Sequence, residues 1–197
     1  MTFPARLAVA SKNAHKRREI ARICADWPVT WLEDADWPDV DEPHATYLEN
    51  ALAKALAVSA ALGVPALADD SGIEVDALGG GPGPRSARFA GEGASDQENL
   101  ALLVEELGRA VGRPRTARYR CVAAVAWPEG ETLHAEGVCE GSLVTEPSGE
   151  RGFGYDPIFV PVGFDRTMAE LTDEEKDRIS HRGRALTALG ERLATTG

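Results

Sequence analysis

Apolar and polar positions follow different periods along the chain, and each period predicts an element. Residues 6–11, RLAVAS, form a short apolar run typical of a buried strand. Residues 13–24 place apolar side chains on one side at helical spacing, with basic side chains elsewhere. A strand followed directly by a helix puts SKNAHK (11–16) at the turn, where backbone amides at the helix N-terminus favour anions.

Three further helices are marked by capping signals. A Ser or Thr followed three residues later by Glu is the capping-box pattern, and it occurs at Thr46, Ser95 and Thr172. The helices predicted from these caps are Tyr47–Leu62, Asp96–Leu107 and roughly Asp173–Leu193.

The remaining apolar runs predict strands and loops. ALADD (66–70) is a short strand, and GIEVDAL (72–78) is a second strand or a hairpin arm. Residues 116–127 and 132–143, joined by PEGE, predict a hairpin. The stretches 34–43 and 149–157 are expected to be loops. This order predicts an α/β fold, a single domain over 1–197 with helices around a mixed sheet.

Composition narrows the function classes. The chain of 197 residues has a net charge of −11, which argues against nonspecific binding to nucleic acid or to an anionic membrane. A polyanionic substrate would need a local basic pocket or bridging cations. The three cysteines show no CxxC spacing and are expected to stay reduced, as small packed groups in a cytoplasmic protein. No transmembrane run or secretory pattern is present in this sequence.

Two adjacent carboxylates, Asp69 and Asp70, end the predicted strand 66–70. Neighbours on an extended strand point to opposite faces, so both reach one metal only if the strand ends or bends there. Ser71–Gly72 would permit such a bend. Magnesium usually takes one or two carboxylates plus substrate phosphates. The alternative interpretation is a turn with two solvated acids.

A glycine-rich stretch follows, LGGGPGPRSAR (78–88). Its glycines allow a close backbone approach to a ligand, and Arg88 can bind phosphate through two N–H groups. It is not a P-loop, because GxxxxGK[ST] does not occur in the chain. The alternative is a flexible surface loop, just as simple helix capping is the alternative for SKNAHK.

Two later motifs are candidates for recognising a base. Phe153 in GFGYDP is flanked by glycines, which leaves its ring available for stacking; the alternative is a core aromatic in a tight turn. His181 and Arg182 are adjacent donors in the last predicted helix, where the alternative is a polar helix face. Lys176 lies five residues before His181 and off its helical stripe, so a shared ligand explains their association better.

Together the motifs resemble one known family. SKNAHK, ENALAKA, ADDSGIEVDALGGGPGPRSARF, GFGYDPIF and ELTDEEKDRISHRGRA occur in this order, and they resemble the inosine/xanthosine triphosphate pyrophosphatase family, also called Ham1-like. The resemblance implies a long mixed sheet flanked by helices, in two lobes with a central cleft. It also implies a homodimer that uses Mg²⁺ to hydrolyse ITP, dITP and XTP to the monophosphate and pyrophosphate.

The same resemblance implies residue roles. Asp70 matches the catalytic base and metal ligand, with Asp69 assisting and Lys54 as a buried active-site lysine. Glu42 matches a metal-binding glutamate. The substrate-binding residues implied are Ser11, Lys12, Asn13, Ala14, His15, Lys16, Ser71, Arg88, Phe153, Gly154, Tyr155, Asp156, Lys176, His181 and Arg182. Lys12 and His15 depart from the small residues often found at those positions.

Two alternatives come from other classes. A Maf-like pyrophosphatase, similar in fold, would prefer dTTP, UTP or modified nucleotides, and the GFGYDP and SHRG motifs argue against it. A regulator that binds nucleotide without catalysis would not need the acidic residues that the resemblance assigns to catalysis and metal binding. All of these residues are present in the sequence, which argues against this alternative. The expected partner is thus a small nucleoside triphosphate, with neither nucleic acid nor membrane involved.

Overall fold

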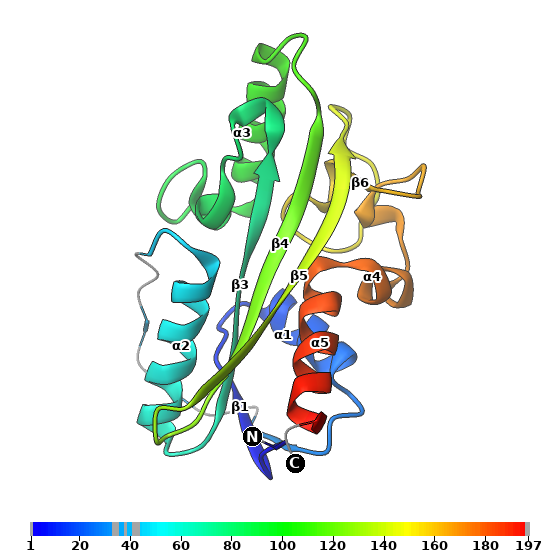
Figure 1. Cartoon of the computed structure of the whole chain (residues 1–197). Helices are drawn as coiled ribbons and strands as arrows, with labels where there is room; N and C mark the ends of the chain where they lie inside the picture. Colours follow the sequence, from blue (N-terminus) through cyan, green and yellow to red (C-terminus); the bar gives the residue numbers. More distant parts are fainter. Residues whose placement is uncertain (1, 33–35, 38, 41–43, 196–197) are drawn as a thin grey trace. The chain divides into compact units, whose positions relative to one another are not determined.

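The strands form one six-stranded mixed sheet in the order β2-β1-β3-β4-β5-β6 (Figure 1). The computed structural model describes residues 2–32, 36–37, 39–40 and 44–195. β1 (Arg6–Val9) pairs in parallel with β2 (Thr30–Leu32) and β3 (Ala66–Val75). β4 (Thr116–Ala126) lies between β3 and β5 (Thr132–Leu143), and β5 pairs antiparallel with β6 (Phe159–Pro161). The predicted mixed α/β architecture is confirmed.

The chain divides into two compact units. Unit 1 comprises Met1–Asp70, Cys121–Gly137 and Arg182–Gly197, and unit 2 comprises Ser71–Arg120 and Val138–His181. The strands β3, β4 and β5 each contribute residues to both units.

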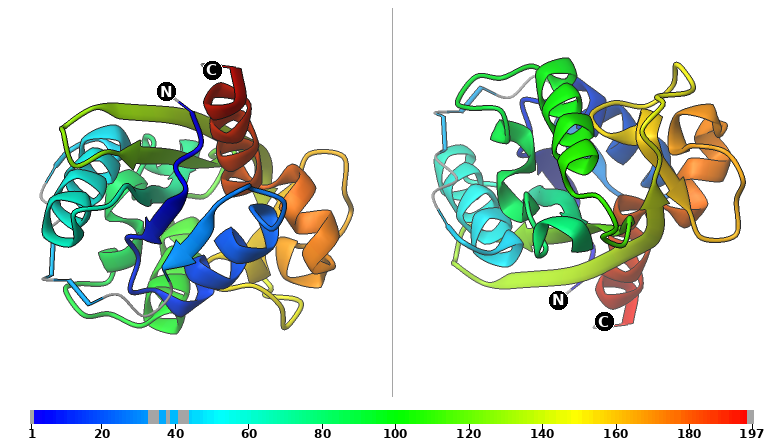
Figure 2. Two further views of the ribbon diagram at one scale, coloured as in Figure 1. Left: turned by 90° about the horizontal axis from the view of Figure 1, so that it is seen from below. Right: turned by 90° about the horizontal axis from the view of Figure 1, so that it is seen from above.

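In unit 1 the period of two along the strands separates two cores. Leu7 and Leu67 face α1 (Ala14–Ile23) and α5 (His181–Thr195), whereas Ala8 and Ala68 face α2 (Tyr47–Leu62). In the left view of Figure 2, α2 (cyan) lies on one side of β1 (dark blue), and α5 (red) lies on the other. Because alternate side chains point to opposite faces, each strand supplies both cores at once.

Unit 2 has its own core. Leu103 and Leu107 of α3 (Asp96–Arg109) pack with Tyr119 of β4 and Phe159 of β6 in one buried cluster. The short helix α4 (Asp173–Ile179) follows later in the same unit.

The helix predictions are largely confirmed, with one error. α2 spans Tyr47–Leu62 as predicted, and α3 extends two residues past the predicted end. The single helix predicted over Asp173–Leu193 is wrong, because the chain leaves helical geometry at Ser180 (φ −65°, ψ 155°) and α5 starts at His181. This extended backbone is typical of the residue that precedes a helix, a position that serine favours.

The prediction that a short strand ends at Asp70 is also wrong, and the bend that Ser71–Gly72 would permit does not occur. β3 runs without interruption from Ala66 to Val75. A Cβ at Gly72 would collide with the carbonyl oxygen of Gly83 and with Ser86 Oγ. Glycine is therefore needed here for close approach of another segment, and the strand stays extended.

Two expectations about composition can also be compared with the structure. Cys24, Cys121 and Cys139 are all free and buried, as expected of small apolar groups. Among the helices that the structure describes, none combines the length and the hydropathy needed to cross a membrane.

Candidate active site

The adjacent carboxylates of β3 lie in unit 1 and have different partners. Asp69 is 1% exposed and contacts residues of α1 and α5, whereas Asp70 is 3% exposed and contacts α2. This split follows from the unbroken strand, because adjacent side chains on a strand point to opposite faces. The two acids therefore have different electrostatic surroundings.

Asp69 lies among cations. Its Oδ2 accepts hydrogen bonds from Arg182 Nε (3.2 Å) and Nη2 (3.0 Å), and Lys16 Nζ lies 3.3 Å away. Burial alone would raise the pKa of Asp69, but the surrounding cations outweigh it and hold that pKa well below its usual range. Burial would likewise lower the pKa of Lys16, but the nearby acidic groups, Asp69 first and Asp70 after it, together outweigh burial and raise that pKa. Asp69 is consequently a fixed anion.

Arg182 joins Asp69 to a second acid. It is 1% exposed, and its Nη1 donates to Glu19 Oε2 of α1. Burial would lower the pKa of Arg182, but the two carboxylates raise it further above its already high usual value. We did not predict Glu19 from the sequence. It lies directly before the buried Ile20 and three residues after Lys16 on the same helix, and this spacing was a signal that could have identified it. The predicted role of Arg182 in base recognition stays a prediction.

Asp70 has a neutral partner. Its Oδ2 accepts a hydrogen bond from Asn50 Nδ2 (3.0 Å), and Asn50 is fully buried on α2. One turn later on the same helix, Lys54 donates from Nζ to the backbone carbonyl of Asp69 (2.6 Å). We did not predict Asn50 from the sequence either. Asn50 and Lys54 lie four residues apart on the alanine-rich buried face of the helix, and two polar residues on such a face are an unusual pair that could have identified it.

The residues present fit a hard cation only in part. Magnesium prefers oxygen ligands, and the carboxylate of Asp70 offers them. Asn50 instead turns its Nδ2 toward Asp70, while its Oδ1 accepts from the backbone amide of His44 (3.1 Å). Within the described parts of the chain, no group of three or more His, Cys, Asp or Glu residues is arranged to hold a metal. Glu42, the second predicted ligand, lies outside the described residues.

The SKNAHK segment combines capping with one contact to the acidic pair. Asn13 caps α1, accepting from the backbone amides of His15 and Lys16. His15 Nδ1 lies 2.8 Å from Arg18 Nη2. Lys12 pairs with Asp39 at 2.5 Å, and both are exposed. Within this segment, the side chain of Lys16 contacts the Asp69–Asp70 pair through Asp69.

In unit 2, Asp156 collects several of the predicted base-site residues. Its Oδ2 accepts from Lys176 Nζ (2.5 Å) and from the backbone amide of Phe153 (2.9 Å). Lys176 Nζ also lies 5.2 Å from the centre of the Phe153 ring. Any Cβ at Gly152 would collide with Asp156 Oδ2, so this glycine is required for the arrangement.

The other predicted residues of this loop are anchored nearby. His181 stacks on Tyr119 with ring centres 4.6 Å apart and planes 9° apart. The backbone amide of Gly154 donates to Asp96 Oδ2 (3.1 Å), and Tyr155 Oη donates to the carbonyl of Ser86 (2.7 Å). Burial, with Asp96 nearby, raises the pKa of Tyr155.

The glycine-rich stretch folds back on β3. Ser86 Oγ accepts from the amide of Ile73 (2.9 Å) and donates to the carbonyl of Gly83 (2.6 Å). Arg88 Nε lies 3.6 Å from Glu92 Oε1. Ser86 thus has an internal structural role, and phosphate binding by Ser71 and Arg88 stays a prediction.

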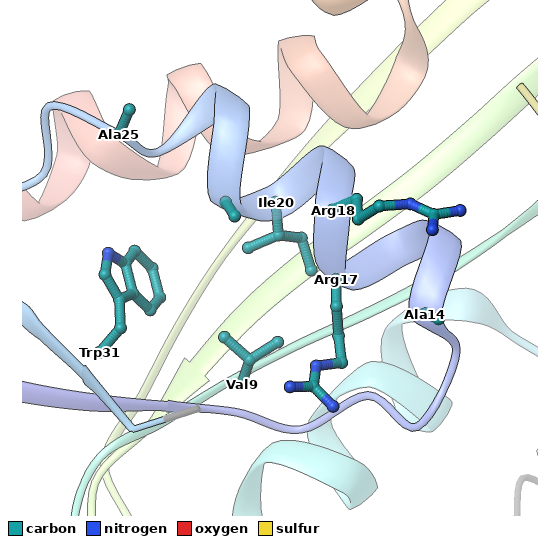
Figure 3. A pocket seen from close by; sticks show the side chains of 8 residues that line it. Val9, Ala14, Arg17, Arg18, Ile20, Ala25 and Trp31 are labelled. Carbon is teal, nitrogen blue, oxygen red and sulfur yellow. The ribbon is translucent and has the colours of Figure 1, made fainter. Parts of the chain in front are cut away.

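A pocket of about 470 Å³ lies elsewhere in unit 1, beside α1, β1 and β2 (Figure 3). Arg17, Val9 and Trp31 line it, and Figure 3 shows the Arg17 guanidinium near Val9. Ala14 is the one predicted substrate-binding residue in its lining. This pocket is therefore distinct from the surroundings of Asp69 and Asp70.

Comparisons with known proteins support the family resemblance that the sequence motifs indicated. Residues 7–192 match the model of the Ham1 family. The chain is 48% identical over 188 residues to the dITP/XTP pyrophosphatase of Geobacillus kaustophilus, covering 94% of this chain and 92% of that protein. It is 47% identical over 195 residues to the dITP/XTP pyrophosphatase of Geobacter sulfurreducens, covering 98% of both.

A solved structure matches over the same length. The HAM1 protein of Coxiella burnetii superposes with a TM-score of 0.87 at 38% identity, covering 98% of each chain. Sequence and fold agree over nearly the whole chain, and the chain therefore belongs to the Ham1 family.

Proposed function

We propose that this chain hydrolyses dITP, ITP and XTP to the monophosphate and pyrophosphate, and so removes them from the nucleotide pool. Relatives named dITP/XTP pyrophosphatases support the substrate class. The observation that carries the proposal is the unequal pair on β3. Asp69 is held by cations, whereas the adjacent Asp70 is held by the neutral amide of Asn50.

Asp70 is the proposed catalytic base. It orients a water for attack on the α-phosphorus and accepts its proton, while the bond between the α-phosphorus and the bridging oxygen breaks and pyrophosphate leaves. Asp69, locked by Arg182 and Lys16, fixes the strand on which Asp70 lies. Lys16 and Lys54 supply positive charge for the phosphates in a chain of net charge −11.

Asp70, together with Glu42, would hold Mg²⁺. When bound, the ion would neutralise phosphate charge and lower the pKa of the attacking water. The carboxylate of Asp70 supports this choice of cation, because carboxylate oxygens are the ligands that Mg²⁺ prefers.

The unit 2 residues are the proposed base-reading groups. Lys176 is a donor beside the acceptor Asp156, and this pair matches a base edge with a carbonyl at position six and N1–H beside it. Hypoxanthine and xanthine present that edge, whereas adenine presents an amino group and an unprotonated nitrogen. Phe153, close to Lys176, is the proposed stacking ring.

The test is a substrate panel. Purified protein is incubated with dITP, ITP, XTP, GTP, ATP, dTTP and UTP, with Mg²⁺ or with EDTA, and pyrophosphate is measured separately from orthophosphate. The expected result is Mg²⁺-dependent pyrophosphate from dITP, ITP and XTP. Preference for dTTP or UTP would favour a Maf-like activity, and nucleotide binding without turnover would favour a regulator. Size-exclusion chromatography with light scattering tests the expected homodimer, and cell fractionation tests the cytoplasmic location.

A further inference from the structure

We propose that Tyr119 of β4 is a positioning and specificity-determining residue for base recognition. None of the motifs singles it out, since it lies in a strand between Arg118 and Arg120. In the structure its side chain contacts both His181 and Asp156. The inference rests on the proposed function of the unit 2 residues.

The ring of Tyr119 supports His181. The two rings are nearly parallel, 9° apart, with centres 4.6 Å apart. The ring of Phe159 lies 4.7 Å away at 57°. Tyr119 is 6% exposed, so its position is set by packing. A His181 side chain stacked in this way is held in one orientation before any base arrives.

The hydroxyl of Tyr119 orients Asp156. It donates to Asp156 Oδ1 (3.2 Å), while Lys176 Nζ and the Phe153 amide occupy Oδ2. Asp156 is 3% exposed, so water is largely excluded from its carboxylate. The hydroxyl therefore sets the rotation of the carboxylate, and with it the direction of the acceptor that pairs with Lys176.

Packing alone does not require this hydroxyl. A phenylalanine would satisfy the contacts with Phe159 and His181 equally well. The neighbouring arginines have a different role: Arg118 pairs with Asp76 and Glu140, and Arg120 with Glu74. Tyr119 is thus separate from that ion-pair set, and its hydroxyl acts on a predicted base-site residue.

The test compares Tyr119→Phe, Tyr119→Leu, Asp156→Asn and the double variant Tyr119→Phe/Asp156→Asn in the full-length protein. Thr116→Val is the matched control, since it removes another β4 hydroxyl that donates to an aspartate, Asp76. For each, kcat and KM are measured with dITP, XTP, GTP and ATP, after circular dichroism has established folding.

Tyr119→Phe is expected to raise KM for dITP and XTP about 3- to 10-fold, leave kcat within about 2-fold, and lower the dITP-over-ATP ratio of kcat/KM. The double variant should lose little beyond Asp156→Asn, because both changes remove one interaction. Tyr119→Leu should lose more, since His181 also loses its stacking partner. Thr116→Val should match the wild type.

An unchanged KM and substrate ratio in Tyr119→Phe, or losses that simply add in the double variant, would overturn the role of the hydroxyl. Equal values for Tyr119→Leu and Tyr119→Phe would overturn the role of the ring. These outcomes are distinct from failure of the proposed function, which would appear as a wild-type protein that hydrolyses neither dITP nor XTP.

Discussion

Two adjacent residues of one strand can have very different electrostatic partners when other elements pack on both faces of that strand. Asp69 meets Arg182 and Lys16, and Asp70 meets Asn50. A carboxylate paired with cations is a weak base, because its proton affinity has been lowered. Asp70 accepts its hydrogen bond from a neutral amide instead. This difference makes Asp70 the candidate base.

Asp70→Asn is therefore expected to lower kcat for dITP by about 10²- to 10⁴-fold, the range typical of a lost general base. The replacement is nearly the same shape, so the free energy of unfolding should change much less than kcat. Steady-state pyrophosphate release checks the rate, and urea denaturation checks the fold. Asp26→Asn, at an exposed site in unit 1, is the control. An Asp70→Asn enzyme with near wild-type kcat would exclude Asp70 as the base.

Arg182→Met should destabilise the protein by about 3–5 kcal/mol, because it leaves Asp69 and Glu19 buried without their shared cation. Urea denaturation at neutral pH measures this loss. Arg184→Met, at an exposed position of the same helix, should cost far less. Comparable losses in the two variants would show that the buried cluster contributes no more than a surface arginine.

Asp69 should also give stability a defined pH dependence. Its folded pKa lies below its unfolded value of about 3.9, so its contribution is fully present above that pH and is lost as the pH falls toward the folded pKa. The difference in unfolding free energy between wild type and Asp69→Asn should be constant from pH 7 to about pH 4 and then shrink by up to about 1.4 kcal/mol per pH unit. Urea titrations at pH 7, 5 and 3 test this. A difference that grows below pH 4 would contradict it.

At the scale of elements, β3 depends on one glycine. Gly72→Ala places a Cβ against the Gly83 carbonyl and Ser86 Oγ. It should destabilise the protein by about 1–3 kcal/mol, in the range of overpacked sites. Gly108→Ala in α3 is the opposite case, since nothing lies within 4 Å and its φ is not positive. It should stabilise by about 0.5–1 kcal/mol. Thermal and urea midpoints distinguish the two; a stabilising Gly72→Ala would refute the close approach.

At the scale of the whole molecule, the two units are joined by continuous strands. β3, β4 and β5 each pass from one unit to the other, so melting one unit should disrupt strands of the other. The four tryptophans, Trp27, Trp31, Trp37 and Trp127, all belong to unit 1. Tryptophan fluorescence therefore reports on unit 1, while far-ultraviolet circular dichroism reports on both.

We expect urea transitions followed by fluorescence and by circular dichroism to coincide, as for a two-state protein. Gly72→Ala lies in unit 2, and it should move the fluorescence midpoint of unit 1 by as much as the circular dichroism midpoint. Two separated transitions, or a fluorescence midpoint that ignores this variant, would show that the units unfold independently.

The sequence by itself determined the elements and the local chemistry. The span Tyr47–Leu62, the caps at Thr46 and Ser95, and the strand Thr132–Leu143 could be predicted because periodicity and capping act between residues close in the chain. The family could be recognised for the same reason, since its motifs are short and ordered.

Only the tertiary structure decided the partners. The Arg182–Glu19 pair spans 163 positions and Tyr119–Asp156 spans 37, separations that no local pattern encodes. The unbroken β3 likewise depends on Gly83 and Ser86, which approach Gly72 from another segment. Local propensity allowed a bend at Gly72 and a continuous last helix. Long-range packing instead gave an uninterrupted strand, and the extended backbone at Ser180 divided the last helix into two.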